Sequence, residues 1–426
     1  MNKDIILKLL KEEMAPALGV TEPSTIALAT ARAVAETEGE INKVELILDP
    51  GIYKNTYSCG IPNTTEKGIE MAVLLGVVNG DYNLGLQVLQ NITSKDVKKA
   101  KELKENIYID IKVKEGYKDI YVNSKIYTEQ SISLVTIKDR HDNISHLAVD
   151  GQVIFDKDEE QKESDLKRKN PFREIKIEEI LKFINDIEFK DIKFTLDAVK
   201  MNKKLAQKGK VGPGMGLGAG LTNLVKDNEI ADDIANYAQR LTAFAVDARM
   251  GGIPKPAMSF CGSGDHGIIA TLPLTAVTER KKISKDKLAK SIILSYIITY
   301  YIKSKTGKLS AYCGCAIAAG SGACAGIAYL LGGNEEQIVG AINNMVGNIT
   351  GMICDGGNYG CSLKAATAAS TAVESALLAV NNYYLNANNG IVGKDLQETL
   401  DNMGQIAEPG MEQTNHVILD ILKERE

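Results

Sequence analysis

Tryptophan is missing from this sequence, and aromatic residues make up only 5% of it. The segment up to Leu18 also lacks the pattern of a signal peptide, because it is interrupted by charged side chains and has no apolar core. The most apolar run, at 291–301, is too short to cross a bilayer and has lysines on both sides. We therefore expect a cytoplasmic protein that has no membrane partner.

The cysteines also argue against a disulfide framework, because they are seven, an odd number, and clustered. Neither sign of charge dominates: the net charge is −5 at pH 7, which favours neither nucleic acid nor an acidic membrane surface. The 426 residues, with 44% hydrophobic and 25% charged side chains, have the composition of a soluble globular protein of two or more domains. The cysteine pattern therefore points to thiolate chemistry or a metal.

The pattern of apolar residues changes twice along the chain. Residues 41–155 begin with a strand-like alternation in KVELILD and continue with several short alternating runs, which predicts an antiparallel sheet with two helices. The parts on either side are helical. We therefore predict an α+β fold, with a mostly helical catalytic body of residues 1–39 plus 165–426 and an inserted antiparallel-sheet α+β domain at 41–155. The charged segment 156–170 is predicted to be a loop or linker.

Apolar residues at helical spacing predict the helices of both parts. Asn2 is a suitable N-cap for the first helix, and Ser24 for the second. The predicted helices cover 3–18, 24–36, 65–78, 84–104, 177–187, 192–208, 230–249, 266–278, 285–301, 311–331, 335–349, 363–384 and 413–425.

Five of the seven cysteines lie between Leu309 and Lys364, among glycine, alanine and serine residues. Small side chains leave space, and we expect a group that is not a side chain, such as an iron–sulfur cluster, to fill it. Zinc fits less well, because the C-x-C and C-x6-C spacings are not those of zinc ribbons. Three thiolates around a four-iron cluster would leave one iron open as a Lewis acid. The five cysteines are Cys313, Cys315, Cys324, Cys354 and Cys361.

The remaining cysteines have simpler interpretations. Cys324 lies within an alanine-rich segment and is most simply a small buried residue. Cys59 is interpreted as structural. Cys261 could approach a site, but packing is its simpler role.

The turn FCGSGDHG, at 260–267, precedes a predicted helix, and the N–H groups of a glycine turn at a helix start can hold a carboxylate. His266 would lie in the first turn of that helix, where the helix dipole favours the neutral imidazole that a general base needs. A structural histidine with Asp265 as the helix cap is the competing interpretation. Lys364, next to Cys361 at a helix start, could face a substrate carboxylate or be a surface lysine.

The glycine-rich stretch VGPGMGLGAG, at 211–220, could cradle a phosphate. It lacks the preceding strand of a dinucleotide-binding fingerprint and the Gly-Lys-Ser/Thr of a P-loop. We therefore interpret it as a flexible or tightly packed loop.

Several longer stretches, taken in order, resemble one family. PALGVTEPSTIALA near the start, GSGDHGIIATLPL in the middle, and LSAYCGCAIAAGSGACAGIAYLLGG with MICDGGNYGCSLKAATA resemble the L-cysteine desulfidases. This family is related to the α domain of iron–sulfur L-serine dehydratases, and the resemblance covers nearly the whole chain. It implies an oxygen-sensitive [4Fe–4S] lyase of amino-acid catabolism. Such an enzyme removes the β-substituent of a small amino acid and yields pyruvate and ammonia, with sulfide when the substrate is cysteine.

The resemblance also implies roles for individual residues. The cluster ligands would be Cys354, Cys361 and one of the pair Cys313 and Cys315, with Cys313 preferred. His266 would remove the α-proton, and Lys364 is the second catalytic candidate. The substrate-binding candidates are Thr21, Ser263 and Asp265.

The sequence departs from the family pattern within three motifs. Val20 stands where the first motif usually has cysteine, Asp265 where the middle motif more often has asparagine, and Gly357 and Asn358 differ from the usual CDGAK. L-Cysteine desulfidation is the first hypothesis and L-serine dehydration the second. A non-catalytic cluster- or zinc-binding protein is the third. We expect a small amino-acid substrate and no nucleic acid, and a homo-oligomer stays open.

Overall fold

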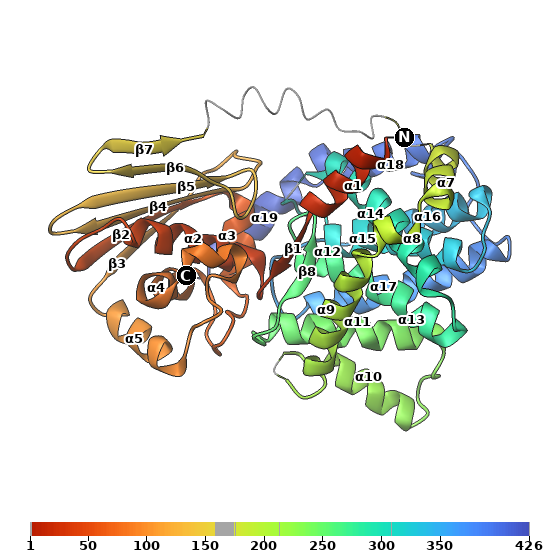
Figure 1. Ribbon diagram of the computed structural model, residues 1–426, viewed down its shortest axis with the longest axis horizontal. Coiled ribbons are helices and arrows are strands. Elements are labelled where there is room, and N and C mark those ends of the chain that lie inside the picture. Colours follow the sequence, from red (N-terminus) through yellow and green to blue (C-terminus); the bar gives the residue numbers. More distant parts are fainter. Residues whose placement is uncertain (1, 158–173, 175, 213, 308, 426) are drawn as a thin grey trace.

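The computed structural model describes residues 2–157, 174, 176–212, 214–307 and 309–425, and it has the predicted α+β fold (Figure 1). Two bodies lie side by side, one built on a sheet and one larger and helical. Helix and strand labels are those of Figure 1. Residues 158–170 of the predicted linker lie outside the described residues, and Asp156 is the last residue of strand β7.

The six-stranded sheet runs in the order β3-β2-β4-β5-β6-β7. Val44, Leu46 and Leu48 of β2 are buried, as their alternation predicts. Strands β2 and β3 are parallel and all other neighbours antiparallel, so the predicted antiparallel sheet is mixed at one edge. The parallel pair follows from the helices between these strands, because a crossover returns the chain in the same direction. The strands are β2 (Ile41–Leu48), β3 (Tyr108–Val113), β4 (Tyr121–Thr128), β5 (Ile132–Lys138), β6 (Ile144–Val149) and β7 (Gln152–Asp156).

Helix α2 (Thr21–Val34) shares the core of the sheet body, and so does the C-terminal helix α19 (Glu412–Lys423). Ile26 and Leu28 of α2 are buried in this core. This packing differs from the predicted division, which placed residues 1–39 and the C-terminal helix in the helical body. An alanine-rich helix can be buried in either body, and only tertiary contacts decide between them. The other helices of the sheet body are α3 (Pro50–Tyr57), α4 (Ile69–Asn79), η1 (Tyr82–Gln87) and α5 (Ser94–Lys104).

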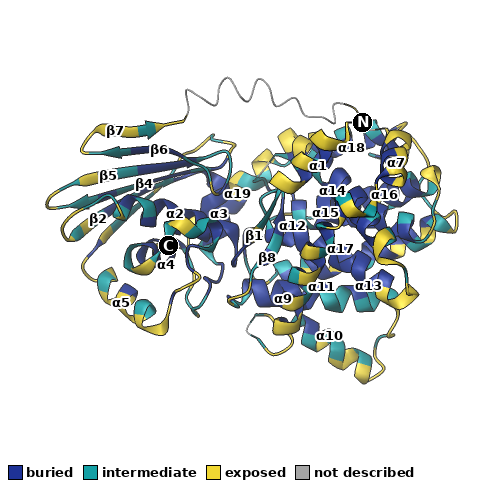
Figure 2. Ribbon diagram, in the orientation of Figure 1, coloured by how far each residue is buried: buried dark blue, intermediate teal, exposed yellow. Residues whose placement is uncertain are grey.

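The helical body is organised around α15 (Gly314–Leu330), which is buried along almost its whole length (Figure 2). An added Cβ at Gly326 would lie 2.7 Å from Ser291 O on α14 (Lys285–Thr306), and one at Gly320 would lie 3.0 Å from Met345 Cε on α16 (Glu335–Ile349). The small residues therefore allow close helix packing. Along α15, neighbouring helices fill the space that the sequence analysis assigns to a nonprotein group.

The bounds of the remaining elements complete the helical body. Among the described helices, α17 alone is long and apolar enough to cross a membrane by length and composition, and 56% of that stretch is buried inside the protein. The elements are α1 (Lys3–Glu12), β1 (Met14–Ala17), α7 (Ile177–Asp186), α8 (Phe189–Ile192), α9 (Thr195–Gly209), α10 (Leu217–Lys226), α11 (Ile234–Met250), β8 (Ala257–Phe260), α12 (Gly264–Ile269), α13 (Leu272–Lys281), α14 (Lys285–Thr306), α16 (Glu335–Ile349), α17 (Cys361–Val380), α18 (Leu396–Gln405) and η2 (Ile406–Gly410).

The first predicted helix, 3–18, ends early at Glu12, and strand β1 follows it. Pro16 explains the break, because proline cannot continue a helix. Strand β1 pairs antiparallel with β8, with Met14 opposite Phe260. This pairing brings the N-terminal segment next to the FCGSGDHG turn.

Most other predicted helices are present with different ends. Segment 335–349 forms α16 as predicted, whereas 266–278 is divided into α12 and α13. Helix α2 begins at Thr21, and the Ser24 hydroxyl donates to the carbonyl groups of Leu18 and Val20 instead of capping a helix. Helices α3, α10 and α18 are absent from the prediction.

The glycine-rich stretch packs tightly against α11. Gly218 N donates to Asp247 Oδ2 at 2.9 Å, and an added Cβ at Gly214 would lie 2.5 Å from Asp247 O. Residues 217–220 of the stretch form the first turn of α10, so the interpretation as a loop is wrong for them; the described residues 211, 212 and 214–216 belong to no helix or strand, and Val211 is 91% exposed.

Candidate active site

A cavity of about 460 Å³ lies where the two bodies meet. Its walls come from the β5–β6 turn and α3 of the sheet body, and from α14, the turn after β8 and the segment before α15 in the helical body. Cavities between domains that are lined by convergent polar groups commonly bind small ligands. The polar and thiol side chains that line it include Glu22, Asn55, His141, Cys261, Ser263, His266, Lys303, Ser310, Cys315 and Cys354.

The turn after β8 places His266 at the cavity wall. Cys261 and Gly262 have positive φ values of 47° and 75°. Phe260 and Ser263 exchange two backbone hydrogen bonds across the turn, of 3.0 and 3.1 Å. A positive φ in a residue other than glycine is uncommon and occurs often at functional turns, which fits the position of Cys261 on the cavity.

His266 is held by one ring nitrogen and presents the other toward Gly314. Nδ1 lies 3.1 Å from Phe260 O and must carry the proton there, because a carbonyl oxygen only accepts. Burial, and then the positive charge of Lys303, lowers the pKa of His266 to about 3. The imidazole is therefore neutral at neutral pH, with Nε2 unprotonated. Burial is the main cause of the low pKa, and the helix dipole expected from the sequence is not.

Lys303 of α14 is a half-buried cation in the same wall. Its Nζ donates to Gly307 O at 2.6 Å. Burial lowers the pKa of Lys303, although the cysteine thiols near it oppose the shift. Gly314 separates this ammonium from His266: an added Cβ would lie 2.9 Å from His266 Nε2 and 3.1 Å from Lys303 Nζ. The glycine between the two cysteines of the C-x-C motif is thus required by close approach.

Backbone hydrogen bonds bring the two cysteine segments together. Cys313 N donates to Met352 O at 3.1 Å, and Cys354 N donates to Ala311 O at 2.6 Å. Cys361 follows as the first residue of α17. Two segments that are separated by α15 and α16 therefore present their thiols in one region.

These thiols interact electrostatically with one another. Burial, and then Cys354, raises the pKa of Cys313 to about 12. Burial also raises the pKa of Cys361, and Asp265, Cys354 and Cys313 add to the shift. Thiols that share one buried region in this way become thiolates only when a bound cation stabilises them.

The donor set fits an iron–sulfur cluster better than a single ion. Among the described residues, no three His, Cys, Asp or Glu side chains are arranged to hold one metal ion. In a [4Fe–4S] cluster each thiolate binds a different iron, so its ligands need not meet at one point. Lys303 and Lys364 lie within electrostatic range of the thiols and would offset the charge of the thiolates.

Lys54 of α3 ties this region to the sheet body. Its buried ammonium donates to Ser310 O at 2.9 Å, to Cys354 O at 3.1 Å and to Asn415 Oδ1 at 3.0 Å. A single cation therefore joins both cysteine segments to helix α19. The position of Cys354 depends on the packing of the two bodies.

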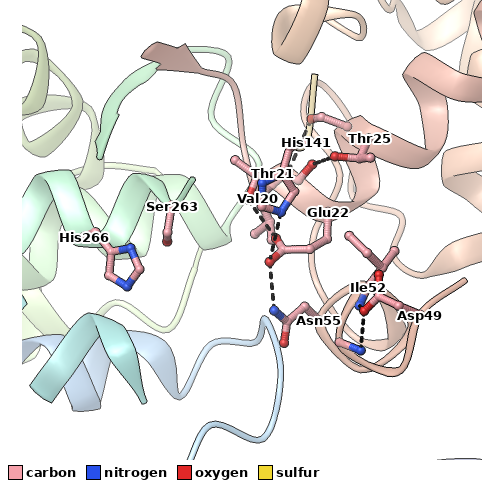
Figure 3. Close-up of polar contacts among 12 residues, drawn as sticks. Val20, Thr21, Glu22, Thr25, Asp49, Ile52, Asn55, His141, Ser263 and His266 are labelled. Atoms are coloured by element: carbon pink, nitrogen blue, oxygen red, sulfur yellow. Dashed lines mark hydrogen bonds and ion pairs between the residues drawn. The ribbon is translucent and has the colours of Figure 1, made fainter. Parts of the chain in front are cut away.

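Glu22 forms part of the wall on the sheet-body side, across from Ser263 and His266 (Figure 3). Glu22 Oε2 accepts a hydrogen bond from Thr21 Oγ1 at 2.9 Å, and Oε1 accepts one from Asn55 Nδ2 at 2.8 Å. His141 Nε2 lies 3.8 Å from Oε1, which is too far for a hydrogen bond. The Glu22 carboxylate is therefore buried and held in one orientation.

Asp265 is held in a buried ion pair with Arg249. Arg249 Nη1 lies 2.9 Å from Asp265 Oδ1, and both side chains are buried. Arg249 is also attracted electrostatically by Glu22. The carboxylate that stands where the family more often has asparagine thus has a guanidinium partner.

Val20 lies beside the loop that carries Cys354 and Cys361. An added Cβ at Gly357 would lie 3.3 Å from Val20 Cγ1. The LGVTEP turn and the cysteine loop are therefore neighbours. The methyl groups of Val20 fill the place where the family pattern usually has a thiol.

The structure brings only part of the predicted residue set to the cavity. Among the described residues that line it are Ser263, His266, Cys354 and the alternative ligand Cys315. The predicted residues that do not line it are Thr21, Asp265, Cys313, Cys361 and Lys364.

Lys364 forms an ion pair with Asp355 at the start of α17. Although burial opposes it, the Lys364 ammonium lowers the pKa of Asp355. The positive charge of Lys364 also acts on Cys313 and Cys354. The structure thus places Lys364 near the thiols and away from the cavity wall.

Sequence reasoning missed several residues of the wall, above all Lys303, Glu22 and Asn55. Glu22 could have been found, because it is the only acidic residue in the alanine-rich stretch TEPSTIALATARAV. Lys303 lies in YYIKSK, which has the pattern of an ordinary polar helix end. Asn55 and His141 come from the other body, and their position depends on how the two bodies pack.

Comparison with known proteins assigns the chain to a family. The family described as serine dehydratase alpha chain matches residues 83–420. A UPF0597 protein of Clostridium botulinum (strain Hall) is 45% identical and covers 100% of this chain and 99% of its own length. UPF0597 proteins of Alkaliphilus oremlandii and Clostridioides difficile (strain 630) are 42% and 39% identical, over 100% and 98% of this chain and 99% of each relative. This chain belongs to the serine dehydratase alpha-chain family.

Proposed function

We propose that this chain is a lyase that eliminates the β-substituent of a small α-amino acid, with L-cysteine as the first substrate and L-serine as the alternative. The observation that carries the proposal is a single cavity lined by both His266 and Cys354. A neutral base and a metal-binding thiol beside one small polar cavity suit an elimination reaction. The family assignment supports the same reaction class.

Cys313, Cys354 and Cys361 would hold a [4Fe–4S] cluster, with Cys315 as the alternative to Cys313. When bound, such a cluster supplies an open iron that acts as a Lewis acid toward the leaving group. Cys313 is favoured because its backbone N–H donates to Met352 O at 3.1 Å, in the segment that carries Cys354. All seven cysteines are free, which suits the reducing cytoplasm that we propose as the location.

His266 Nε2 would accept the α-proton of the substrate. The Cα–H bond breaks, its electron pair forms the Cα–Cβ double bond, and the bond from Cβ to sulfur or oxygen breaks to release the leaving group. The aminoacrylate then hydrolyses to pyruvate and ammonia.

Substrate binding would strengthen His266 as a base. An imidazole with a pKa of about 3 accepts protons weakly at neutral pH. After burial, the positive charge of Lys303 is the largest cause of this low pKa. A substrate carboxylate next to Lys303 would offset that charge and raise the pKa of His266.

The other predicted residues would position groups and take no part in proton transfer. Ser263 stays a substrate-binding candidate because it lines the cavity. Thr21 would act through Glu22, which accepts its hydrogen bond. Lys364 would stabilise the thiolate forms of the nearby cysteines. Asp265, held in its ion pair, would not touch the substrate.

L-Serine is the alternative because of Val20. The L-cysteine desulfidase pattern has a cysteine at this position. In this chain the residue is Val20, which lies beside the loop that carries Cys354 and Cys361. Hydroxide is a poorer leaving group than thiolate, and a Lewis acid compensates for the difference. The family description, serine dehydratase alpha chain, favours the same alternative.

Anaerobic purification after iron–sulfur reconstitution tests the proposal. Iron, sulfide and zinc are quantified, and pyruvate is followed with L-cysteine and with L-serine. We expect about four irons per chain and pyruvate from one of the two amino acids. A cluster without pyruvate would point to a non-catalytic cluster protein, and zinc in place of iron would refute the cluster.

A further inference from the structure

The cavity has charged groups of opposite sign in two of its walls, and none of them belongs to the residue set predicted from the sequence. We propose that Glu22, with Asn55, binds the α-ammonium group of the substrate and that Lys303 binds its α-carboxylate. This assignment rests on the proposed function for the location of the substrate. It makes the site selective for zwitterionic α-amino acids over 2-hydroxy acids and simple carboxylic acids.

Glu22 is the buried carboxylate of the anionic wall, whereas the neighbouring ion pair of Arg249 and Asp265 does not line the cavity. One guanidinium, Arg249, faces two carboxylates, because it forms an ion pair with Asp265 and is also attracted by Glu22. A substrate ammonium next to Glu22 would balance the second carboxylate. Buried charges are retained where a partner offsets them, and the substrate can be that partner.

The same wall has an unused acceptor. Asn55 Nδ2 donates to Glu22 Oε1 at 2.8 Å. Asn55 Oδ1 is buried and has no hydrogen-bond partner among the described residues. An ammonium group has three N–H donors, so it could bond to Glu22 and to this amide oxygen together.

The cationic wall is formed by Lys303. Its ammonium is fixed by Gly307 O at 2.6 Å and lies next to Gly314, whose missing side chain leaves room beside His266 Nε2. Lys364, the other cation near the thiols, is less suitable because it does not line the cavity. A carboxylate at Lys303 would also lie beside the base that takes the α-proton.

This arrangement predicts discrimination by loss of hydrogen bonds. A ligand without the ammonium group leaves the Glu22 carboxylate buried and unbalanced. Sites that bond to a polar group of the substrate reject analogues that lack it far more strongly than apolar pockets reject a missing methylene. We therefore expect L-alanine to bind about 100-fold more tightly than L-lactate or propionate.

Isothermal titration calorimetry on the anaerobically reconstituted protein tests this assignment. L-Alanine is a suitable probe because it has both charged groups and no leaving group. Glu22→Gln should weaken L-alanine binding by about 10-fold or more and leave propionate binding unchanged. Lys303→Met should weaken the binding of both L-alanine and propionate by a similar factor. Glu13→Gln is the matched control, since Glu13 also lines this cavity, and it should bind as wild type does.

Each outcome is decisive for the assignment. Equal binding of L-alanine and L-lactate by wild type would overturn it without any variant, as would wild-type affinity of Glu22→Gln for L-alanine. A pyruvate assay on the same samples keeps the two proposals separate. Selective L-alanine binding without pyruvate formation would support the charge assignment and refute the lyase. Pyruvate formation by wild type, together with wild-type L-alanine affinity in Glu22→Gln, would support the lyase and refute the charge assignment.

Discussion

Replacing Gly314 by alanine would place a methyl group between His266 and Lys303. The new Cβ would lie 2.9 Å from His266 Nε2 and 3.1 Å from Lys303 Nζ. Nonbonded heavy atoms prefer a separation of about 3.5 Å, so one group must move by about half an ångström. Lys303 is anchored to Gly307 O, and His266 is anchored to Phe260 O. The displacement therefore falls on the pair of groups that would contact the substrate.

Gly314→Ala should therefore lower the rate of pyruvate formation and leave the stability of the fold unchanged. A misplacement of about 1 Å can reduce catalysis about 100-fold, so we expect a loss of roughly 10-fold in kcat for pyruvate formation. Alanine is preferred over glycine in a helix by about 1 kcal/mol, and Gly314 is the first residue of α15, so the thermal midpoint should be kept.

The matched control is Gly220→Ala in α10, where an added Cβ would meet nothing within 4 Å. Pyruvate formation and thermal unfolding are measured for both variants after anaerobic reconstitution. Wild-type kcat in Gly314→Ala would refute the placement of the reaction between His266 and Lys303. A fall in thermal midpoint that matches the fall in rate would instead assign Gly314 to packing.

Three further predictions follow from the contacts of the site. Cys354→Ser should lower the iron content of the reconstituted protein, whereas Cys324→Ala, at a buried cysteine away from the cavity, should keep it; equal iron in both would contradict the ligand assignment. His266 has a pKa of about 3 in the folded chain against about 6.5 when unfolded, so stability should fall as pH drops below 6.5, by about 3 kcal/mol between pH 7 and 4.5. In urea unfolding of the iron-free protein, His266→Gln should lose less free energy of unfolding between pH 7 and 4.5 than wild type does. An equal loss in both proteins would refute the low pKa of His266. Lys54→Met removes three hydrogen bonds of a buried lysine and should lower the free energy of unfolding by about 3 kcal/mol. The control Lys423→Met removes an exposed ion pair and should lower it by less than about 1 kcal/mol. Equal losses in urea unfolding would show that Lys54 does not hold the cysteine segments.

The sequence predicts that the cysteine segments lie together, but it does not show what the small residues around them contact. The clustering of Cys313, Cys354 and Cys361 among small residues indicates a common region, and two backbone hydrogen bonds between their segments bring them together. The interpretation of the small residues was wrong along α15. Gly326 and its neighbours permit helix contact, and a pattern of small residues has the same appearance whether a cofactor or another helix fills the space.

The sequence alone determined most of the elements and part of the residue set that lines the cavity, namely Ser263, His266 and Cys354. Local spacing settles whether a segment is a strand or a helix, because period and capping act over a few residues. The sequence also identified His266 and the cysteine pairs, because the glycines around them are their neighbours along the chain. Only the tertiary structure decided that α2 packs on the sheet, that Lys303 lies beside Gly314, and that Glu22 and Asn55 complete the cavity from the other body. Burial and long-range packing set the charge environment of these groups, and neither can be computed from neighbours along the chain.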